Sequence, residues 1–393
     1  MRWWPLLGLV FLAAVLLGIY PLAIFAVMLL IIVGLARWWQ THALDHITYR
    51  RVFPYRRGFP GEEISMLVEV ENWKFLPVSW LRAQDLLPNA VGPRDETLLK
   101  PTYQPEVGQL ISLFSLRWYE RDRRQYELLL RNRGVYRLGP VRLVSGDLFG
   151  LLEDIDQESG SSDVLTVFPK PLSYQSMHLP ADDPFGDRSA RRRLYEDPNL
   201  TMGVRDYRPD DDFRRIHWLA TAHTGSLQVK VYQPVSARVL VACLNASTLA
   251  HFWEGYKPEL LEYLASYTAA LVQRGLEDGY RVGLISNGCL GTADQPFRVP
   301  PGRSPDQLSH LLTALAAITP IVAGSFERFL VSEIPRLAYG ATLVVITALT
   351  SPALVETLLR LKKYGHKITL IVISESLPAG LHDLRVVHVP YVA

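Results

Sequence analysis

Hydrophobic positions fill the first 40 residues without any polar alternation. No charged side chain occurs from Trp3 to Ala36, and a run of this length exceeds the ~18 apolar residues that indicate a membrane span. A cleaved signal peptide is the alternative, but its apolar core would be only ~7–15 residues long and end at a small-residue cleavage site. We therefore expect residues 1–44 to be a transmembrane anchor, with residues 3–39 in contact with membrane lipid.

The centre of this run contains a predicted break. A single helix over the whole run would be ~50 Å long, against a hydrocarbon core of ~30 Å. Gly18, Tyr20 and Pro21 lie at the midpoint, and proline interrupts a helix because it lacks an N–H group. The pattern favours a re-entrant hairpin of two short helices, Leu6–Ile19 and Leu22–Ala36, over one long span.

Basic residues follow the apolar run, whereas Arg2 alone precedes it. The later residues are Arg37, Arg50, Arg51, Arg56 and Arg57. The positive-inside rule places this heavier flank, and the soluble part of the chain, in the cytoplasm at the cell membrane. The adjacent Trp38 and Trp39 indicate an anchor at the membrane interface.

Residues 45–170 show the partial alternation that is typical of strands, as in Ile64–Val70 and Gln109–Trp118. Glycine, proline and asparagine recur between the strands, which predicts an immunoglobulin-like β-sandwich without that fold's Cys…Trp…Cys core. Arg121–Arg133 is either a basic binding patch or, as we favour, a solvated strand face with salt bridges. We expect the polar run Asp154–Asp163 to be a hairpin tip.

Residues 171–236 have few periodic apolar positions and are expected to form a linker. Arginines at 188, 191, 192 and 193 could bind phosphate or anionic lipid, but the surrounding carboxylates favour internal pairing. The run Arg205–Trp218 interleaves arginines with aspartates, which can form bidentate pairs that fix a linker. Asp211 or Asp212 can cap a short helix, and its expected apolar face carries Phe213, Ile216 and Leu219. We expect Trp218 to be a large apolar anchor, whose replacement by alanine destabilises the protein if the indole is buried in a core.

The same run allows a catalytic interpretation. Asp210, Asp211 and Asp212 with His217 and His223 could ligate a metal ion or perform acid–base chemistry. The run contains no histidine pair at a ligand spacing and no aspartate ladder ending in glutamate. A structural or docking element is therefore favoured over a hydrolase.

From residue 237 to the end, apolar strands alternate with amphipathic helices, which predicts a doubly wound parallel sheet. No Gly-x-Gly-x-x-Gly or Walker sequence occurs, so nucleotide binding has no support. The expected strands are Val239–Leu244, Tyr280–Ser286, Ala341–Thr347, Ile368–Ser374 and Val386–Val389, and the expected helices are Pro258–Arg274, Pro305–Ala317, Phe326–Leu337 and Ala353–Tyr364.

Composition narrows the class of protein. A chain of 393 residues, 49% hydrophobic and 20% charged, is globular and large enough for two or three domains. A net charge of +2 gives no reason to expect a nucleic-acid partner. Only Cys243 and Cys289 are present, both in or beside apolar runs, which indicates buried thiols in a reducing compartment.

The run Arg205–Trp218, with the Thr-Gly pair ending at Gly225, resembles the signature of the bacterial domain of unknown function 58 family. Shorter segments such as Arg133–Pro140 and Asp147–Leu151 are also similar, so the resemblance covers nearly the whole chain. Asp210 replaces the family's usual glycine and His223 its usual arginine. The signature positions that we expect to form an interaction element are Arg205, Asp206, Tyr207, Arg208, Asp211, Asp212, Arg214, Ile216, Trp218 and Gly225.

This resemblance implies a von Willebrand factor type A-like fold for residues 237–393, with a metal site that begins Asp-x-Ser-x-Ser after the first strand. The matching positions here hold Asn245, Ser247 and Leu249, and Ala348 stands where a later aspartate is usual. Divalent ions need several hard oxygen ligands, usually with carboxylate charge. We therefore expect a degenerate site and no bound metal or cofactor.

Three functions follow as expectations. The first is a membrane-anchored, non-catalytic adaptor or scaffold; the resemblance implies a MoxR-type AAA+ ATPase as its protein partner in a chaperone-like or envelope-related system. The second is a hydrolase or metal-dependent enzyme that uses the Asp/His cluster at 210–223. The third is a self-assembling structural membrane protein. The absence of a nucleophile–base motif favours the first over the second, while the first and third differ only in the partner.

Overall fold

The computed structural model describes residues 4–146, 155–159, 162–177, 179, 195–235, 239–291, 293–338, 340–375 and 383–391. The chain divides into two compact units, Met1–Phe168 and Pro169–Ala393. The first contains two N-terminal helices and a β-rich domain. The second contains a small two-stranded lobe and an α/β domain.

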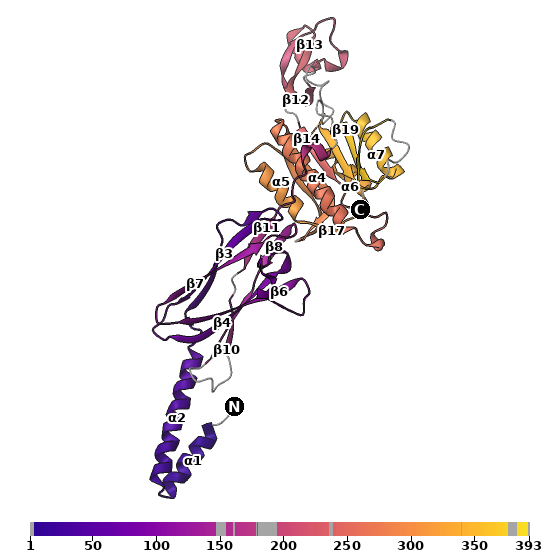
Figure 1. Cartoon of the computed structure of the whole chain (residues 1–393). Coiled ribbons are helices and arrows are strands. Elements are labelled where there is room, and N and C mark those ends of the chain that lie inside the picture. The colour runs from indigo at the N-terminus through magenta and orange to yellow at the C-terminus, as the bar shows by residue number, and fades with distance from the viewer. Residues whose placement is uncertain are drawn as a thin grey trace. The chain divides into compact units, whose positions relative to one another are not determined.

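The N-terminal helices α1 (Trp4–Leu16) and α2 (Tyr20–Thr41) lie side by side as a hairpin (Figure 1). Gly18 makes the turn with a φ of 71°, which glycine adopts without a Cβ clash. Pro21 lies in the first turn of α2, where its missing N–H group costs no hydrogen bond. Ala14 and Ala26 are buried, which indicates that the helices approach through small residues. The predicted break is therefore present, but α2 continues beyond Ala36 to Thr41.

Length and composition distinguish the two helices. At ~1.5 Å per residue, the 22 residues of α2 span about 33 Å, enough for a hydrocarbon core of ~30 Å. Its mean hydropathy reaches 2.2, and among the described residues it is the one helix long and apolar enough to cross a membrane. With 13 residues, α1 spans only about 20 Å. On these grounds α2 could serve as a membrane anchor.

The β-rich domain is a sandwich of antiparallel strands. One sheet has the order β1-β3-β7 and another the order β10-β9-β4-β6-β5, while β2, β11 and β8 form a third, small sheet in which β2 and β11 are parallel. The bounds are β1 (Ile47–Val52), β2 (Arg57–Gly58), β3 (Glu63–Asn72), β4 (Val78–Pro88), β5 (Leu99–Pro101), β6 (Val107–Leu116), β7 (Arg121–Leu129), β8 (Gly134–Leu138), β9 (Val141–Ser145), β10 (Ile155–Ser159) and β11 (Asp163–Val167).

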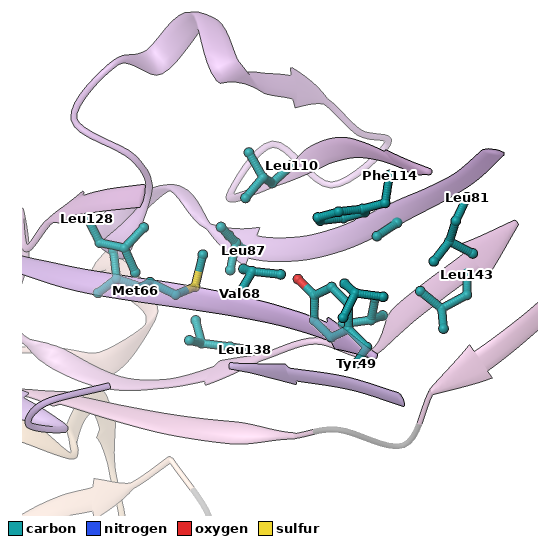
Figure 2. Packing of buried hydrophobic residues seen from close by; sticks show 14 of the residues in the cluster. Tyr49, Met66, Val68, Leu81, Leu87, Leu110, Phe114, Leu128, Leu138 and Leu143 are labelled. Atoms are coloured by element: carbon teal, nitrogen blue, oxygen red, sulfur yellow. The ribbon is translucent and has the colours of Figure 1, made fainter. Parts of the chain in front are cut away.

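Strict alternation along the strands builds the sandwich core (Figure 2). Met66 and Val68 of β3 point inward against Leu87 of β4 and Phe114 of β6, and all four are buried. The residues between them on β3 are partly exposed, as expected for a sheet with one face on the core. The predicted β-sandwich is thus confirmed.

The arginine-rich stretch forms β7, whose outward residues pair with glutamates of β3. Arg123 Nε lies 2.7 Å from Glu69 Oε1, and Arg121 pairs with Glu71 in the next outward position of the ladder. Both arginines are about half exposed. The favoured interpretation, a solvated strand face with salt bridges, is confirmed.

The expected hairpin tip at Asp154–Asp163 is wrong. Residues 155–159 form β10, an edge strand of the five-stranded sheet that pairs with β9. Residues 163–167 form β11, which pairs with β8 and β2 in a different sheet. The segment therefore crosses between sheets, and its polar composition suits the exposed edge strand β10.

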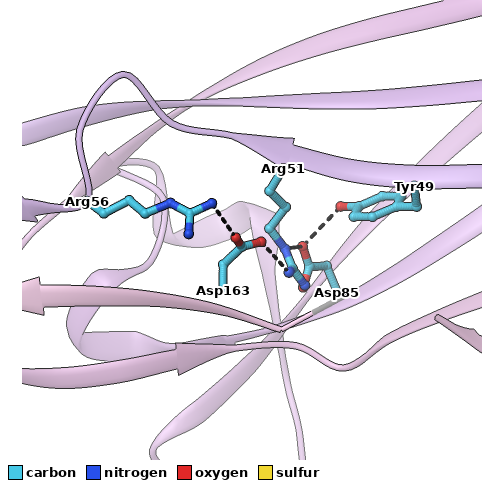
Figure 3. A network of polar contacts seen from close by, with 5 residues as sticks. All are labelled: Tyr49, Arg51, Arg56, Asp85 and Asp163. Carbon is cyan, nitrogen blue, oxygen red and sulfur yellow. Dashed lines mark hydrogen bonds and ion pairs between the residues drawn. The ribbon is translucent and has the colours of Figure 1, made fainter. Parts of the chain in front are cut away.

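A buried ion-pair network joins the strands of the sandwich (Figure 3). The guanidinium of Arg51 on β1 pairs with the carboxylate of Asp85 on β4, and both groups are buried. The Nη2–Oδ1 and Nε–Oδ2 distances are both 2.7 Å. Tyr49 donates its hydroxyl to Asp85 at 3.0 Å. Asp163 accepts from Arg51 Nη1 at 3.2 Å and from Arg56 at 2.9 Å. Burial raises the pKa of the Tyr49 hydroxyl well above its ordinary value, which keeps it a hydrogen-bond donor.

The α/β domain has a mostly parallel sheet in the order β16-β15-β14-β18-β19-β20. Strands β14, β15, β18, β19 and β20 are parallel. Val241 and Cys243 of β14 share a core with α6 and α7, while Leu240, which precedes them on the strand, faces Gly275 of α4, so helices cover both faces. The bounds are β14 (Val239–Leu244), α4 (Pro258–Glu277), β15 (Arg281–Leu290), β16 (Ala293–Gly302), α5 (Gln307–Ala316), β17 (Ile318–Val322), α6 (Phe326–Glu333), β18 (Thr342–Thr347), α7 (Pro352–Lys363), β19 (Lys367–Ser374) and β20 (Arg385–Pro390).

Two strands of this sheet depart from the sequence expectation. Antiparallel β16 and β17 both pair with β15, and neither was expected. Pro296, Pro300 and Pro301 lie within β16, and proline is tolerated on an edge strand because no ladder donor is needed there. The wholly parallel sheet is therefore corrected to a parallel sheet with an antiparallel margin.

Residues 195–235 form a structured lobe where a linker was expected. Strands β12 (Tyr195–Asp206) and β13 (Gln228–Val235) make an antiparallel ribbon, and α3 (Trp218–Thr224) lies in the connection between them. We call residues 195–235 the signature lobe. The arginines at 188 and 191–193 and the segment Asp147–Leu151 lie outside the described residues.

Candidate functional site

A bidentate ion pair joins Arg205, near the end of β12, to Asp211 in the segment that connects β12 with β13. Arg205 Nη2 donates to Asp211 Oδ1 at 2.5 Å and Nη1 donates to Oδ2 at 2.6 Å. The backbone N–H of Arg208 also donates to Asp211 at 2.9 Å. These hydrogen bonds, that of Arg205 first, lower the pKa of Asp211 to about 2. The expected arginine–carboxylate pair is therefore present, within the lobe itself.

Asp212 and His217, both within the run Arg205–Trp218, cap short helices. Asp212 accepts from the N–H of Arg214 at 3.0 Å and begins the 3-10 helix Phe213–Arg215. His217 Nδ1 accepts from the N–H of Ala220 at 3.0 Å and caps α3. Gly225 ends α3 in the left-handed conformation, with a φ of 71°. The His217 ring thus uses one nitrogen to hold the backbone, in the tautomer that leaves Nδ1 unprotonated.

Other signature positions tie this connection to the ribbon. Ile216 is buried and bridges Val229 of β13. Asp206 accepts from the buried Gln228 side chain at 2.6 Å. The Tyr207 N–H donates to the carbonyl of Leu227 at 2.9 Å. The polar signature residues therefore act mainly on the lobe's own fold.

Three large apolar side chains of the lobe remain outside its core. Phe213, Trp218 and Leu219 are 67%, 69% and 69% exposed. The expected single helix face of Phe213, Ile216 and Leu219 is wrong, because Phe213 lies in the 3-10 helix and Leu219 in α3. Only Ile216 of the three is buried, and Trp218 is not buried in a core. The reason is geometric: a seven-residue helix on a two-stranded ribbon has room to bury few side chains, and Ile216 takes that position. Arg208 and Arg214 are exposed in the same connection.

The Asp/His cluster does not assemble as a metal site in this part of the chain. Asp211, Asp212 and His217 are engaged with the arginine and backbone groups described above. Among the residues that the structure describes, no three histidine, cysteine or acidic side chains gather closely enough to hold a metal ion. Within the described signature lobe, these three side chains therefore hold arginine and backbone groups and do not form a metal site.

The carboxyl edge of the parallel sheet carries neutral polar groups at the degenerate metal positions. Asn245 Nδ2 donates to Thr347 Oγ1 at 3.0 Å, and its Oδ1 accepts from the N–H of Ser247 at 3.1 Å. Asn287, within β15, accepts from the N–H of Ala246 at 2.9 Å and donates to Ser247 Oγ at 3.3 Å. Asn245, Asn287 and Thr347 are buried. Amide and hydroxyl groups satisfy one another here, without a carboxylate.

A pocket opens beside this network. It has a volume of about 610 Å³ and is lined by residues 246–251, Trp253, Gly255 and Tyr256, and by residues 320–322, Gly324 and Ser325. His251 and Trp253 stack at its rim, with ring centroids 4.4 Å apart and an interplanar angle of 5°. Ala348 follows β18 and does not line it. The pocket suits an apolar or neutral group, because no carboxylate lines it to hold a cation.

Sequence reasoning missed Asn287 and this pocket. The residue lies at the carboxyl end of a predicted strand, where ligands of such sheets bind, so an asparagine there was a usable signal. The pocket walls come from segments 64 or more positions apart in the chain, a distance that periodicity does not reveal.

Relatives of the chain agree with the resemblance noted from the signature. The family described as "Protein of unknown function DUF58" matches residues 203–387. "Uncharacterized protein YeaD" of Bacillus subtilis (strain 168) is 24% identical over 329 residues, which cover 80% of this chain and 73% of that protein. Neither description names an activity.

Solved structures with local similarity are distant. The CARDB domain of the PF1109 protein from Pyrococcus furiosus is 12% identical, covers 31% of this chain and 91% of that domain, and has a TM-score of 0.21. A cohesin module from a Clostridium perfringens family 33 glycoside hydrolase is 14% identical and has a TM-score of 0.22; the match covers 31% of this chain and 95% of that module. At these TM-scores the similarity indicates nothing about what this chain binds.

Proposed function

We propose that this protein is a non-catalytic adaptor or scaffold, anchored in the cell membrane by its N-terminal helices, with its soluble units in the cytoplasm. Its partner is a protein that docks on the signature lobe. The family resemblance favours a MoxR-type AAA+ ATPase as that partner, in a chaperone-like or envelope-related system.

The exposure of Phe213, Trp218 and Leu219 carries this proposal. Exposed large apolar side chains rimmed by arginine are typical of protein interfaces, in which tryptophan is a frequent centre of binding energy. The charged residues of the same connection, Arg205, Asp211 and Asp212, are occupied in holding the lobe. The lobe is therefore suited to present these apolar side chains, because the hydrogen bonds described above hold its connecting segment in shape.

The α/β domain supports the same assignment. Numbered in chain order without β17, the strand order β16-β15-β14-β18-β19-β20 is 3-2-1-4-5-6, with the third strand antiparallel. This order agrees with the von Willebrand factor type A-like fold that the resemblance implies, as a doubly wound sheet. Asparagines 245 and 287 stand at its carboxyl edge, and their neutral groups favour binding by shape over metal-mediated binding.

Binding of a purified MoxR-type ATPase to the full chain in detergent tests the proposal. We expect saturable binding, and Trp218→Ala should weaken it about 30-fold, the equivalent of a ~2 kcal/mol interface hot spot. Tyr103→Ala is the matched control, because Tyr103 is an exposed aromatic residue of the sandwich, at 93%. It should bind as the wild type does.

The alternatives predict different outcomes. If Trp218→Ala instead dissociates an oligomer of the chain itself, the self-assembling interpretation replaces the adaptor. If His217→Ala abolishes a hydrolytic activity while the lobe stays folded, the enzyme interpretation replaces the adaptor. No binding of the ATPase to the wild-type chain would refute the proposed partner.

A further inference from the structure

Two neighbouring loops of the β-sandwich expose a group of aromatic side chains. The loop between β3 and β4 carries Trp73 and Phe75, which are 59% and 74% exposed, and the turn between β6 and β7 carries Trp118, 58% exposed. The Phe75 and Trp118 rings stack across the two loops, with centroids 5.8 Å apart and an interplanar angle of 11°. We call Trp73, Phe75 and Trp118 the aromatic tip.

The aromatic tip is joined directly to the end of α2. Lys74 lies between Trp73 and Phe75 in the chain, and its ammonium donates to the carbonyls of His42, Ala43 and Asp45 at 2.6, 2.5 and 2.7 Å. These carbonyls follow the last residue of α2, where the helix dipole favours a cation. The N–H of Trp73 donates to His46 at 3.0 Å. The tip therefore lies where the apolar helix meets the sandwich.

Backbone contacts hold the two loops in this arrangement. The buried Asn72 side chain donates to the carbonyl of Leu76 at 2.9 Å and to that of Arg117 at 2.8 Å, which joins one loop to the other. The N–H of Tyr119 donates to the carbonyl of Lys74 at 3.3 Å. The aromatic rings are thus exposed on a fixed backbone.

The surroundings identify the occupant of this surface. Trp38, in the last turn of α2, is also exposed, at 53%. Tryptophan and other amphipathic aromatic rings are favoured at the level of the lipid headgroups, where one end of the ring is apolar and the other is hydrated. An apolar helix long enough to cross the bilayer ends at the tip. These neighbours favour a lipid surface as the occupant of the aromatic tip.

We propose that Trp73, Phe75 and Trp118 insert into the interfacial layer of the phospholipid bilayer, beside the point where α2 leaves it. This inference rests on the proposed membrane anchoring and adds a second contact, which sets the orientation of the sandwich on the membrane. Lys74, the cation between Trp73 and Phe75, is held by backbone carbonyls. The proposed contact is made by the aromatic rings, so we expect insertion into a bilayer without anionic lipid.

A depth measurement on the full chain tests the insertion. Phe75→Cys is labelled with an environment-sensitive fluorophore and reconstituted into phosphatidylcholine nanodiscs that contain spin-labelled lipid. Cys243 and Cys289 are fully buried, and burial raises the pKa of the Cys243 thiol, so background labelling is small. We expect a blue shift and a loss of emission, equal in discs with and without phosphatidylglycerol.

Tyr103→Cys is the matched control. Tyr103 precedes the other end of β6, about 30 Å along the strand from the turn that bears Trp118. Its probe should keep an aqueous spectrum and resist the lipid quencher. Trp118→Cys provides a second reporter on the tip, independent of any local effect of replacing Phe75.

Flotation of the same chain with vesicles separates the two proposals. If the chain floats but both tip probes match the Tyr103 probe, the insertion is refuted and the anchor stands. If the chain does not float, the anchor fails and the insertion with it. A dependence on phosphatidylglycerol would refute the apolar contact, because it would show that charge holds the surface.

Discussion

The guanidinium of Arg51 lies wholly inside the sandwich, and its charge is balanced by Asp85 and Asp163. Removal of one partner of a buried pair leaves the other charge uncompensated, at a cost of about 3–5 kcal/mol. We therefore expect Asp85→Ala to destabilise the sandwich by that amount. The loss of stability is measured by thermal unfolding of the detergent-solubilised chain, with proteolytic cleavage within residues 47–167 as the signal that the sandwich has unfolded.

The exposed pair of Arg142 and Asp156 supplies the control. Asp156→Ala should change stability by no more than ~1 kcal/mol, since exposed pairs contribute little. The double variant Arg51→Met/Asp85→Leu should recover much of the loss, because an apolar pair needs no charge compensation. Equal losses in Asp85→Ala and Asp156→Ala would contradict this account.

The pKa of Asp211 makes the signature lobe sensitive to acid. Its value of about 2 lies below the ordinary 3.8, because Arg205 donates two hydrogen bonds to the carboxylate. A depressed pKa means that folding favours the charged form, so this stabilisation is complete above about pH 4 and is lost as the pH falls through 2. Hydrogen exchange at residues 205–228, corrected for intrinsic rates, should show protection falling over that window.

Asp211→Asn should remove this pH dependence and lower protection at neutral pH. Asp210→Asn is the neighbouring control and should behave as the wild type does, because the exposed Asp210 side chain caps and pairs with nothing in the signature described above. A wild-type profile in Asp211→Asn would show that the bidentate pair does not hold the turn.

At the scale of elements, we expect different residues of the signature lobe to stabilise its fold and to bind the partner. Ile216 is buried against β13, and Ile216→Ala should cost about 2–5 kcal/mol and open the connection between β12 and β13. Trp218→Ala should change stability by less than about 0.5 kcal/mol, because the indole is exposed. Hydrogen exchange over residues 203–232 distinguishes the two variants, and similar losses of protection in both would mean that the indole packs in solution.

The carboxyl edge of the α/β sheet should be indifferent to divalent ions. Asn245, Asn287 and Thr347 supply only neutral oxygens, which are already engaged with one another or with the backbone. Calorimetry with Mg²⁺, Ca²⁺ and Mn²⁺ should show no saturable binding below the millimolar range. Micromolar binding that Asn245→Ala abolishes would contradict this expectation.

At the scale of the whole molecule, the orientation of the anchor follows from charge. Arg37, Arg50 and Arg57 lie after the apolar run, and Arg2 alone lies before it. The positive-inside rule then predicts a cytoplasmic C-terminus. A fluorescent protein fused after Ala393 should be bright, and alkaline phosphatase at the same place should be inactive; the reverse pattern would overturn the cytoplasmic localisation.

Much of the fold could be predicted from local pattern. The break at Gly18 and Pro21, the alternation of β3 and the strand Val239–Leu244 all depend on neighbours within one turn or two positions. Strand β16 could not be predicted in this way. Its prolines disfavour a strand unless the segment lies at the edge of a sheet, and the sequence does not show that position. Residues 155–159 joined a different sheet from residues 163–167, and sheet membership is a contact between distant segments.

By itself, the sequence determined the apolar helical hairpin, the division into β-rich and α/β parts, and the paired charges of the signature, because each is encoded by periodicity, composition or close spacing. Only the tertiary structure decided which large side chains are covered. In the signature lobe Ile216 is buried and Trp218 is exposed, while Trp73, Phe75 and Trp118 gather at the end of α2 from two separate loops. The burial of a side chain depends on which distant segments pack against it, and the local sequence around the residue does not specify those segments.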